Sequence, residues 1–241
     1  MEKIVEVSNI KKSFGNFEVL KGISFEIKKG EIFGLIGPNG AGKTTTLRIL
    51  TTIIKPDSGK VKILGYDLQK NSYQIKKVIS YLPEEAGAYK NLSGRDYLSF
   101  MAEFFAKNKA QKKKILERGC ELANLGKALF KKTSTYSKGM LRKLLLAKSL
   151  MTKPELAILD EPTSGLDVLS AIEIREKIKS FSKEGVSFLI SSHNMLEMEY
   201  LCQRIALINK GEIIEEGSPA ELKKKYQASN LEEVFVKAIK K

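Results

Sequence analysis

The chain has 241 residues, of which 42% are hydrophobic and 29% are charged. These values are ordinary for a globular protein and exclude an intrinsically disordered chain. Lysine and arginine number 42 against 28 acidic residues, so the formal net charge is +14, which favours an anionic partner such as a nucleotide, a nucleic acid or lipid head groups.

Signals for membrane insertion, export or disulfide bonding are not apparent in the sequence. No apolar run approaches the roughly 18 residues that a membrane-spanning helix needs. The first ten residues alternate polar and apolar side chains and show no signal-peptide core. Cys120 and Cys202 are far apart and belong to no pair-spaced motif, which excludes a cysteine-based zinc site. We therefore expect a reducing, intracellular setting.

Strands and one helix are predicted for the first 85 residues. Residues 23–27 alternate apolar and polar side chains, the pattern of a half-buried strand. Residues 32–36 form an apolar run that is typical of a fully buried strand. A helix is expected at residues 43–50, and further strands at residues 61–64 and 78–82.

The pattern changes to helices from about residue 91. Ser93 can cap a helix whose apolar face carries large side chains. These are Tyr97, Phe100, Met101, Phe104 and Phe105. We expect most of this face to lie in the protein core. Further helices are predicted at residues 112–125 and 137–151.

Strands return at residues 156–159, 186–190 and 205–208, and residues 209–211 predict a hairpin turn. In order, the elements predict an α/β core that a helical insert at about residues 86–150 interrupts. Asn230 can cap a last helix. We expect its apolar face to pack on the core, with contact to another subunit or to lipid head groups as alternatives.

A glycine-rich loop joins the strand at residues 32–36 to the helix that follows. It matches the pattern G-x-x-x-x-G-K-[ST] at every fixed position. Its residues are Gly37, Pro38, Asn39, Gly40, Ala41, Gly42, Lys43 and Thr44. The glycines let main-chain N–H groups approach phosphate oxygens, and the helix N-terminus adds a positive partial charge. Lys43 is expected to reach the β- and γ-phosphates, and the Thr44 hydroxyl to ligate Mg²⁺.

Two carboxylates and the only histidine follow other predicted strands. Asp160 and Glu161 come directly after residues 156–159; Asp160 would hold Mg²⁺ and Glu161 would polarise an attacking water. His193 follows another core strand, and ligands of open α/β sheets bind at the carboxyl ends of strands, so it could contact a γ-phosphate. The plainer alternatives are a solvated acidic turn and a structural histidine, and the phosphate loop in the same chain favours the functional roles.

Further motifs resemble those of ATP-binding cassette (ABC) ATPases and stand in that family's order. Tyr136-Ser137-Lys138-Gly139-Met140 is similar to the signature Leu-Ser-Gly-Gly-Gln. Residues 164–167, ending in Asp167, resemble the D-loop, residues 81–84 resemble the Q-loop, and His193 stands where the switch histidine stands. Phe14 resembles the aromatic A-loop residue that stacks on adenine. The resemblance covers about residues 1–220.

The chain departs from the family pattern in two motifs. Glu84 stands where the usual residue is glutamine, and a carboxylate can approach Mg²⁺ or its water but only accepts hydrogen bonds. In the signature, Tyr136, Lys138 and Met140 replace the leucine, the first glycine and the glutamine. Both departures resemble ATPase subunits of ABC-2-type exporters. If Ser137 is an ordinary helix cap, its role at a nucleotide is in doubt.

The resemblance implies an α/β fold: a P-loop NTPase (RecA-like) core with an N-terminal antiparallel β subdomain and an inserted α-helical subdomain. Residues 1–85 and 151–220 would form the ATP-binding core, residues 86–150 the helical subdomain, and residues 221–241 a helical tail. The implied activity is hydrolysis of Mg-ATP. The implied catalytic residues are Glu161, His193 and Glu84, and the implied metal site comprises Thr44, Asp160 and Glu84. Nucleotide binding would involve Phe14, residues 37–44, Thr45, Ser137, Gly139 and Asp167.

The resemblance also implies partners. Two ATPase subunits, identical or different, would close head to tail, with each ATP between one phosphate loop and the partner's signature. A membrane-spanning permease subunit would contact the rim formed by Tyr89 and the Glu84-Glu85 loop, and the protein would be cytoplasmic, on the inner face of the cell membrane, driving export. The alternative is a soluble ABC-type ATPase that acts on nucleic acid or a soluble complex. The lysines are scattered and sustained heptads are lacking, so no nucleic-acid partner is expected.

Overall fold

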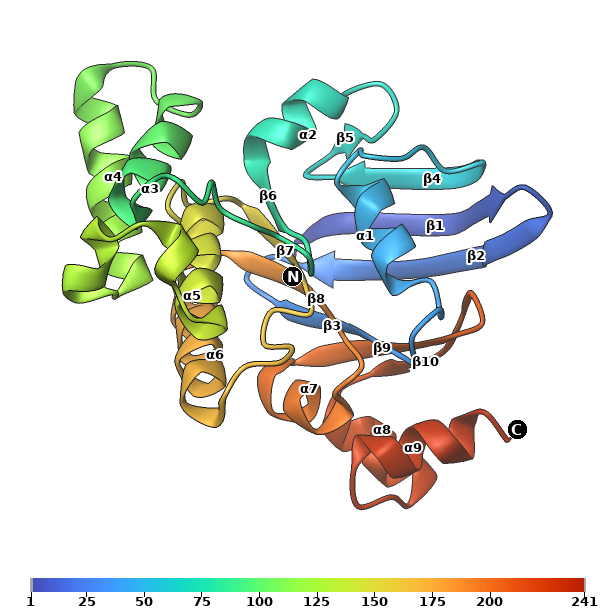
Figure 1. Cartoon of the computed structure of the whole chain (residues 1–241). Helices are drawn as coiled ribbons and strands as arrows, with labels where there is room; N and C mark the ends of the chain where they lie inside the picture. The colour runs from blue at the N-terminus through green and yellow to red at the C-terminus, as the bar shows by residue number, and fades with distance from the viewer. Residues whose placement is uncertain (1, 241) are drawn as a thin grey trace.

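The structure, a computed structural model, describes residues 2–240. Its strands form two β-sheets, of which the smaller lies at the right-hand side of the molecule in Figure 1. The larger sheet has the strand order β10-β9-β3-β8-β7-β6, and the smaller has the order β2-β1-β4-β5. The strands are β1 (Lys3–Phe14), β2 (Phe17–Lys28), β3 (Ile32–Ile36), β4 (Ser58–Ile63), β5 (Tyr66–Asp67), β6 (Ile79–Leu82), β7 (Leu156–Asp160), β8 (Ser187–Ser192), β9 (Arg204–Asn209) and β10 (Glu212–Gly217). The mixed α/β fold with an antiparallel β unit is confirmed.

The larger sheet is parallel except at one edge, where β10 pairs antiparallel with β9. Its central strands are buried on both faces, because successive residues of a strand point to opposite sides. In β3, Ile32 and Ile36 belong to the core on one face, and Phe33 and Leu35 to the core on the other. A strand buried on both faces is an unbroken apolar run, which is why the predicted strand at residues 32–36 is confirmed residue for residue.

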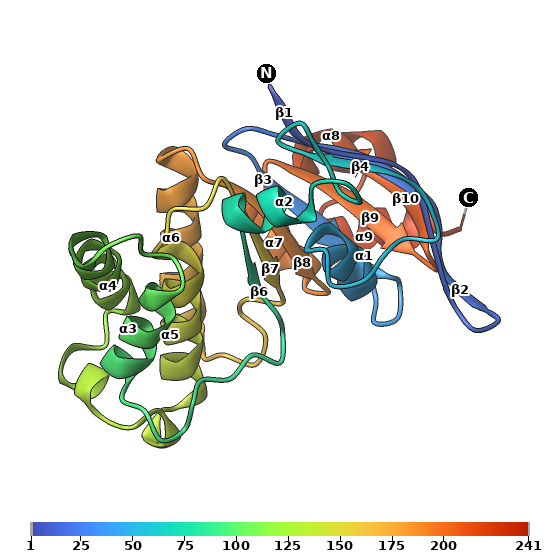
Figure 2. The ribbon, with the colours of Figure 1, turned by 90° about the horizontal axis from the view of Figure 1, so that it is seen from above.

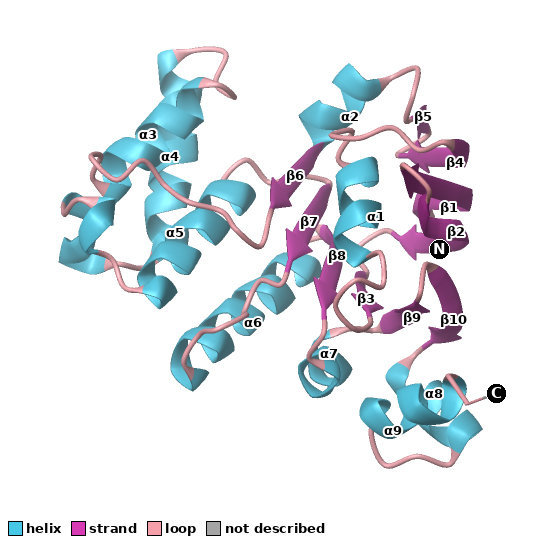
Figure 3. Ribbon diagram, turned by 45° about the vertical axis from the view of Figure 1, so that its right-hand side comes forward, coloured by secondary structure: helices cyan, strands magenta, loops and turns pink. Residues whose placement is uncertain are grey.

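Each face of the larger sheet has its own cover. One core includes α1 (Lys43–Leu50) and the smaller antiparallel sheet. The other includes helices from the second half of the chain, which Figure 3 shows below and beside the sheet. They are α6 (Val168–Lys183), α7 (Met195–Leu201), α8 (Pro219–Tyr226) and α9 (Leu231–Ala238). The helices α2 (Ser72–Val78), α6, α7 and α8 were not predicted from the sequence.

A group of helices lies to one side of both sheets (Figure 2). It comprises α3 (Gly94–Glu103), α4 (Lys109–Ala123), α5 (Lys138–Leu150) and the short 3₁₀ helices η1 (Gly126–Phe130) and η2 (Thr133–Thr135). Ser93 caps α3 as expected, because its hydroxyl accepts a hydrogen bond from the main-chain N–H of Asp96 at 3.1 Å. Side chains of α3, α4 and α5 join the same core as α6 and α7.

The expectation that the aromatic face of α3 lies mostly in the core is wrong. Tyr97 is buried, but Phe100, Phe104 and Phe105 are exposed, and Phe104 keeps 69% of its surface. The helix ends at Glu103, so the last two aromatic residues leave the helical register. Phe100 instead packs edge to face with Phe104 and with Tyr89 on the outside of the helix.

The tail helix α9 packs on its own chain, as expected. The Asn230 side chain accepts from the Glu233 N–H at 2.9 Å and so caps the helix. Leu231 and Val234 are buried against the core that includes α7, and the Leu231 N–H donates to the Glu199 carboxylate at 3.1 Å. Between residues 2 and 240, the structure has no helix that combines the length and the apolar character needed to cross a bilayer.

Candidate functional site

The carboxyl ends of three neighbouring parallel strands lie along one edge of the larger sheet. Ile36 ends β3, Asp160 ends β7 and Ser192 ends β8, with β8 between the other two strands. The register pairs Ile36 with Ser192 and Asp160 with Ser191. The topology therefore brings the phosphate loop, the acidic pair and His193 to the same place, as the sequence motifs predicted.

The phosphate loop is shaped by its glycines and by the start of α1. Gly42 has a φ of 109°, and a Cβ there would lie 2.6 Å from Leu20 Cδ2, so a side chain would be both strained and crowded. The loop wraps around the Lys43 side chain, whose ammonium donates to the carbonyl of Gly37 at 2.7 Å and to that of Pro38 at 3.2 Å. The first N–H groups of α1 have no carbonyl partner within the helix and lie next to the loop, where they can donate to phosphate oxygens.

A buried ammonium and several carboxylates lie close together beside the loop. Burial lowers the pKa of the Lys43 ammonium, and the nearby carboxylates of Glu161, Asp160 and Glu84 oppose that shift. The Lys43 Nζ atom lies 3.9 Å from Glu161 Oε1. An anionic ligand in this place would meet one buried cation and a helix N-terminus, with the carboxylates at its edge.

Glu161 is held by contacts on both carboxylate oxygens. Its Oε1 lies 2.7 Å from His193 Nδ1, and its Oε2 accepts from the Ser192 hydroxyl at 3.1 Å. The residue is buried and has a φ of 46°, a left-handed conformation that is uncommon for a residue other than glycine. Strain of this kind concentrates at functional positions, where the surroundings fix it.

Asp160 and Thr44 offer the oxygen donors that Mg²⁺ prefers. Asp160 is buried at the end of β7, and one of its carboxylate oxygens accepts from the Ser191 hydroxyl. Thr44 lines the pocket beside the phosphate loop. Mg²⁺ sites with few protein ligands rely on substrate phosphates for the rest of the coordination shell. The donor set fits that pattern, and the part of the chain that the structure describes holds no cluster of three or more metal-binding side chains.

The pocket at the loop has a volume of about 240 Å³. Asn39, Gly40, Ala41, Gly42, Lys43, Thr44, Thr45, Glu84, Glu161, Phe17 and Val19 line it. Glu84 is thus at the site, whereas Gly37 and Pro38 form the base of the loop through their contacts with Lys43.

The assignment of Phe14 as the aromatic residue that stacks on adenine stays a prediction. Phe14 is not among the residues that line the pocket, whereas Phe17 and Val19 are. β2 is an edge strand of the smaller sheet and packs against α1, and Phe17 on β2 pairs directly with Phe14 at the end of β1. Phe17 and Val19 are two residues apart on β2 and share a face. The two phenylalanines stand on either side of the turn at Gly15-Asn16, and nothing local in the sequence favours Phe17 over Phe14.

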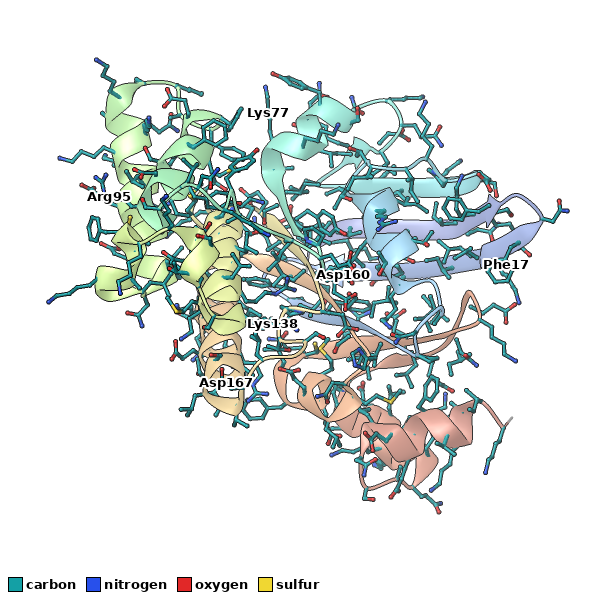
Figure 4. The ribbon with its side chains drawn as sticks, in the orientation of Figure 1. Phe17, Lys77, Arg95, Lys138, Asp160 and Asp167 are labelled. Carbon is teal, nitrogen blue, oxygen red and sulfur yellow. The ribbon has the colours of Figure 1, made fainter. Side chains whose placement is uncertain are left out.

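Ser137, Gly139 and Asp167 are not among the residues that line the pocket. Figure 4 shows Lys138 and Asp167 on the opposite side of the view from Phe17. Ser137 caps α5, because its hydroxyl accepts from the Met140 N–H at 3.2 Å. Asp167 caps α6 by accepting from the Ser170 N–H at 2.9 Å, and this hydrogen bond lowers the pKa of its carboxyl. The two helix starts are adjacent, since a Cβ on Gly139 would lie 2.6 Å from Ser170 Oγ.

One residue near the site was missed from the sequence. The guanidinium of Arg142, on α5, is buried and donates to the main-chain carbonyls of residues on both sides of the pocket. These are Pro83, Glu84, Asp160, Glu161 and Pro162. In the sequence Arg142 is one of several basic residues in a helix, and nothing local indicates that it points inwards.

Comparison with known proteins agrees with this geometry. Residues 20–164 match the family model described as "ABC transporter". The linearmycin resistance ATP-binding protein LnrL of Bacillus subtilis is 38% identical over 219 residues, which are 91% of this chain and 70% of that protein. The bacitracin transport ATP-binding protein BcrA of Bacillus licheniformis is 36% identical over 226 residues, 93% of this chain and 73% of that protein. A solved ATP-binding subunit of an ABC transporter superposes with a TM-score of 0.87 at 25% identity, covering 98% of this chain and 99% of that chain.

Proposed function

Because this chain belongs to the ABC transporter family, we propose that it is the ATPase subunit of an exporter and hydrolyses Mg-ATP at the site beside its phosphate loop. The observation that carries the proposal is the buried Glu161 carboxylate, held by His193 and Ser192 and 3.9 Å from the Lys43 ammonium. The direction of transport rests on the relatives, whose names describe linearmycin resistance, bacitracin transport and Nod factor export.

Binding of ATP would use the loop and the smaller sheet together. The amides at the start of α1 and the Lys43 ammonium would hold the β- and γ-phosphates, because both are positive and aimed at the pocket. Phe17 and Val19, at the other end of the pocket, would contact the adenine ring. Phe14, which pairs with Phe17 across the hairpin, stays the prediction for the residue that stacks on adenine.

Hydrolysis would depend on the residues at the ends of β7 and β8. Glu161 would accept a proton from the water that attacks the γ-phosphate, and the hydrogen bonds to Ser192 and His193 would fix the direction of its carboxylate. With a proton on each ring nitrogen, His193 can donate from Nδ1 to Glu161 and from Nε2 to the γ-phosphate, and Glu84 can accept from the attacking water. Lys43 would stabilise negative charge on the transferred phosphoryl group.

Thr44 and Asp160, with Glu84 at the rim, are the residues that would hold Mg²⁺. When bound, the ion would neutralise charge on the phosphate oxygens. Ser191 would orient Asp160 for this task, because its hydroxyl donates to one carboxylate oxygen and leaves the other for the metal or its water.

The assignment of Glu161 is tested by Glu161→Gln. The amide keeps the size and cannot accept the proton, so we expect ATP to bind with little change and turnover to fall at least about 100-fold. Glu155→Gln is the matched control, because Glu155 is exposed and lies just before the opposite end of β7. This variant should turn over ATP at the wild-type rate. Wild-type turnover in Glu161→Gln would remove Glu161 as the base.

Two subunits would complete the site. Ser137, Gly139 and Asp167 lie outside the pocket of their own chain, and a head-to-tail pair would bring Ser137 and Gly139 to the partner's nucleotide. Residues 1–85 with 151–220 would then form the core of each subunit, residues 86–150 a helical subdomain that moves with the Glu84 loop, and residues 221–241 a tail. The exposed aromatic residues Tyr89, Phe100 and Phe104 would face a helix of the permease.

The partner is tested by co-purification from native membranes in mild detergent. The tagged chain should recover a polytopic membrane protein in stoichiometric amount, which would also place the chain at the inner face of the membrane. A second, different ATPase in the complex would indicate a heterodimer. Recovery of soluble proteins or nucleic acid, with no membrane protein, would contradict the transporter proposal.

A further inference from the structure

Arg142 uses all its hydrogen-bonding capacity inside the protein. An arginine side chain has five N–H donors. Its Nε donates to Pro162 O at 2.9 Å, its Nη1 to Pro83 O at 3.0 Å and Glu84 O at 3.1 Å, and its Nη2 to Asp160 O at 2.7 Å and Glu161 O at 2.8 Å. Each bond ends on a main-chain carbonyl, so the side chain is built into the structure as a connector of backbone segments.

These five carbonyls belong to two segments that are far apart in the sequence. One segment follows β6 and carries Glu84, and the other begins at Asp160, the last residue of β7, and carries Glu161. Both side chains line the pocket beside the phosphate loop. A third element, α5, supplies the guanidinium and begins at the cap Ser137, five residues before Arg142. One planar group thus joins the two carboxylate-bearing segments to the helix that carries the signature.

The charge of Arg142 suits this location. Burial lowers the pKa of the guanidinium, and the carboxylates of Asp160, Glu84 and Glu161 oppose that shift. Because those three carboxylates lie at the site, the buried cation offsets part of their mutual repulsion. Glu84 replaces a neutral glutamine of the family pattern, so this chain has one more negative charge here to offset.

We propose that Arg142 is a positioning residue that holds the Glu84 and Glu161 segments in one fixed arrangement and transmits movement of α5 to both. The proposal rests on the hydrolysis of ATP at this site. None of the five hydrogen bonds of the Arg142 guanidinium ends on the phosphate loop, so the affinity for ATP should depend little on Arg142. The chemical step, which needs Glu161 in a narrow range of positions, should depend on it strongly.

The test compares Arg142→Lys with Arg118→Lys in the full chain. Lysine keeps the charge, but a single ammonium cannot span five carbonyls. We expect kcat of Arg142→Lys to fall about 10- to 100-fold, the scale of a misplaced catalytic group, with KM for ATP nearly unchanged. Arg118 is the matched control, because its Nη1 also donates from a helix to a main-chain carbonyl, that of Met151, at 3.2 Å and away from the pocket. Its variant should keep the wild-type kcat.

A measurement on the unmodified protein covers the case in which Arg142→Lys does not fold. In the nuclear magnetic resonance spectrum of protein labelled with ¹⁵N-arginine, the Arg142 Nη–H groups should give separate signals, because hydrogen bonds on both nitrogens slow rotation of the guanidinium. Addition of ATP should shift these signals, since the segments they bind carry Glu84 and Glu161. Averaged signals, or signals that ATP leaves unchanged, would overturn the proposal.

The outcomes separate this inference from the function on which it rests. A wild-type chain that does not hydrolyse ATP contradicts the proposed function. An active wild-type chain together with a folded Arg142→Lys variant of unchanged kcat overturns the positioning role alone. A rise in KM with an unchanged kcat would also overturn it, because that pattern means loss of ATP binding without an effect on the chemical step.

Discussion

At the scale of single residues, Glu161 combines burial, strain and hydrogen bonding. A left-handed conformation costs a residue other than glycine on the order of 1–3 kcal/mol. Its N–H donates to Ser191 O at 3.0 Å, and both carboxylate oxygens have partners. The surroundings therefore hold an unfavourable backbone conformation in place. A glutamine at this position can keep the contact with Ser192 through its oxygen, so Glu161→Gln removes the negative charge and changes only the contact with His193.

Tyr97 provides a test of burial through pH. It is buried on α3 near Tyr89, and burial is the main cause that raises its pKa to about 12. In the unfolded chain the hydroxyl ionises near about pH 10. The folded state thus keeps a proton that the unfolded state loses, so this contribution to stability is complete below about pH 10 and is lost as the pH rises through 12.

The expected size of the effect at Tyr97 is on the order of 2–3 kcal/mol between those limits. Tyr97→Phe removes the titrating group, so its free energy of unfolding should fall less steeply from pH 9 to pH 11 than that of the wild type. Urea unfolding at both pH values measures the difference, and lysine titration cancels between the two proteins. Parallel pH profiles would show that Tyr97 is not buried as described.

Local motifs predicted most of the candidate site. Residues 37–44, Asp160, Glu161 and His193 could be found because each follows a recognisable strand, and the parallel order of those strands then brings them together. Phe17 and Arg142 could not be found in this way. Phe17 pairs with Phe14 across one hairpin, and no local pattern favours either residue. The role of Arg142 depends on which side of α5 faces inwards, and contacts between segments distant in sequence set that side.

At the scale of elements, the starts of α5 and α6 pack against each other. Gly139 is buried at the first turn of α5, and a Cβ there would lie 2.6 Å from Ser170 Oγ and 3.2 Å from Ser170 Cβ. We therefore predict that Gly139→Ala lowers the stability of the nucleotide-free chain by about 1–3 kcal/mol, the usual cost of overpacking. Chemical denaturation without ATP measures this.

The variant Ser170→Ala tests the cause of that loss. It removes the nearer of the two clashing atoms, so the double variant Gly139→Ala, Ser170→Ala should recover part of the lost stability. Gly87→Ala is the control, since a Cβ on Gly87 meets nothing within 4 Å. If Gly139→Ala were as stable as the wild type, the glycine would be needed only for contact with a nucleotide.

The elements that sequence patterns predicted well are those with one simple periodicity. β3 and the first four residues of β7 are unbroken apolar runs, and α1 was predicted with its bounds. α6 was missed because its apolar residues occupy more than one face: Ile174 and Ile178 are buried, whereas Val168 and Leu169 are exposed. A helix whose apolar residues serve both a core and a surface shows no clean 3.6-residue pattern.

At the scale of the whole molecule, the candidate site is divided between separate surfaces. The pocket beside the phosphate loop has basic and acidic groups for a triphosphate, yet Ser137 and Asp167 lie on another part of the same chain. Figure 4 shows Lys138 and Asp167 near each other and Phe17 on the far side of the molecule. In a pair related by a two-fold axis, each chain could supply both surfaces at once.

Two exposed apolar side chains follow Asp167 and suit a surface that is covered in such a pair. Val168 and Leu169 keep 73% and 74% of their surface in the single chain. Complete burial of one such side chain is worth about 1.5–3 kcal/mol, and each 1.4 kcal/mol corresponds to about a tenfold change in affinity. We predict that changing both to serine weakens ATP-dependent dimerisation at least about tenfold, because each of the two chains contributes both side chains to the interface.

Sedimentation velocity with ATP, in the Glu161→Gln background that binds without hydrolysis, measures this dimerisation. Val236→Ser with Ile239→Ser is the matched control, since these residues are 46% and 45% exposed on the tail, away from the D-loop. The control should dimerise as its parent does, because a head-to-tail pair leaves the tail outside the nucleotide interface. Equal weakening by both double variants would mean that loss of exposed apolar surface, and not its position beside Asp167, controls association. An unchanged dimer in the Val168 and Leu169 variant would place the contact surface elsewhere on the chain.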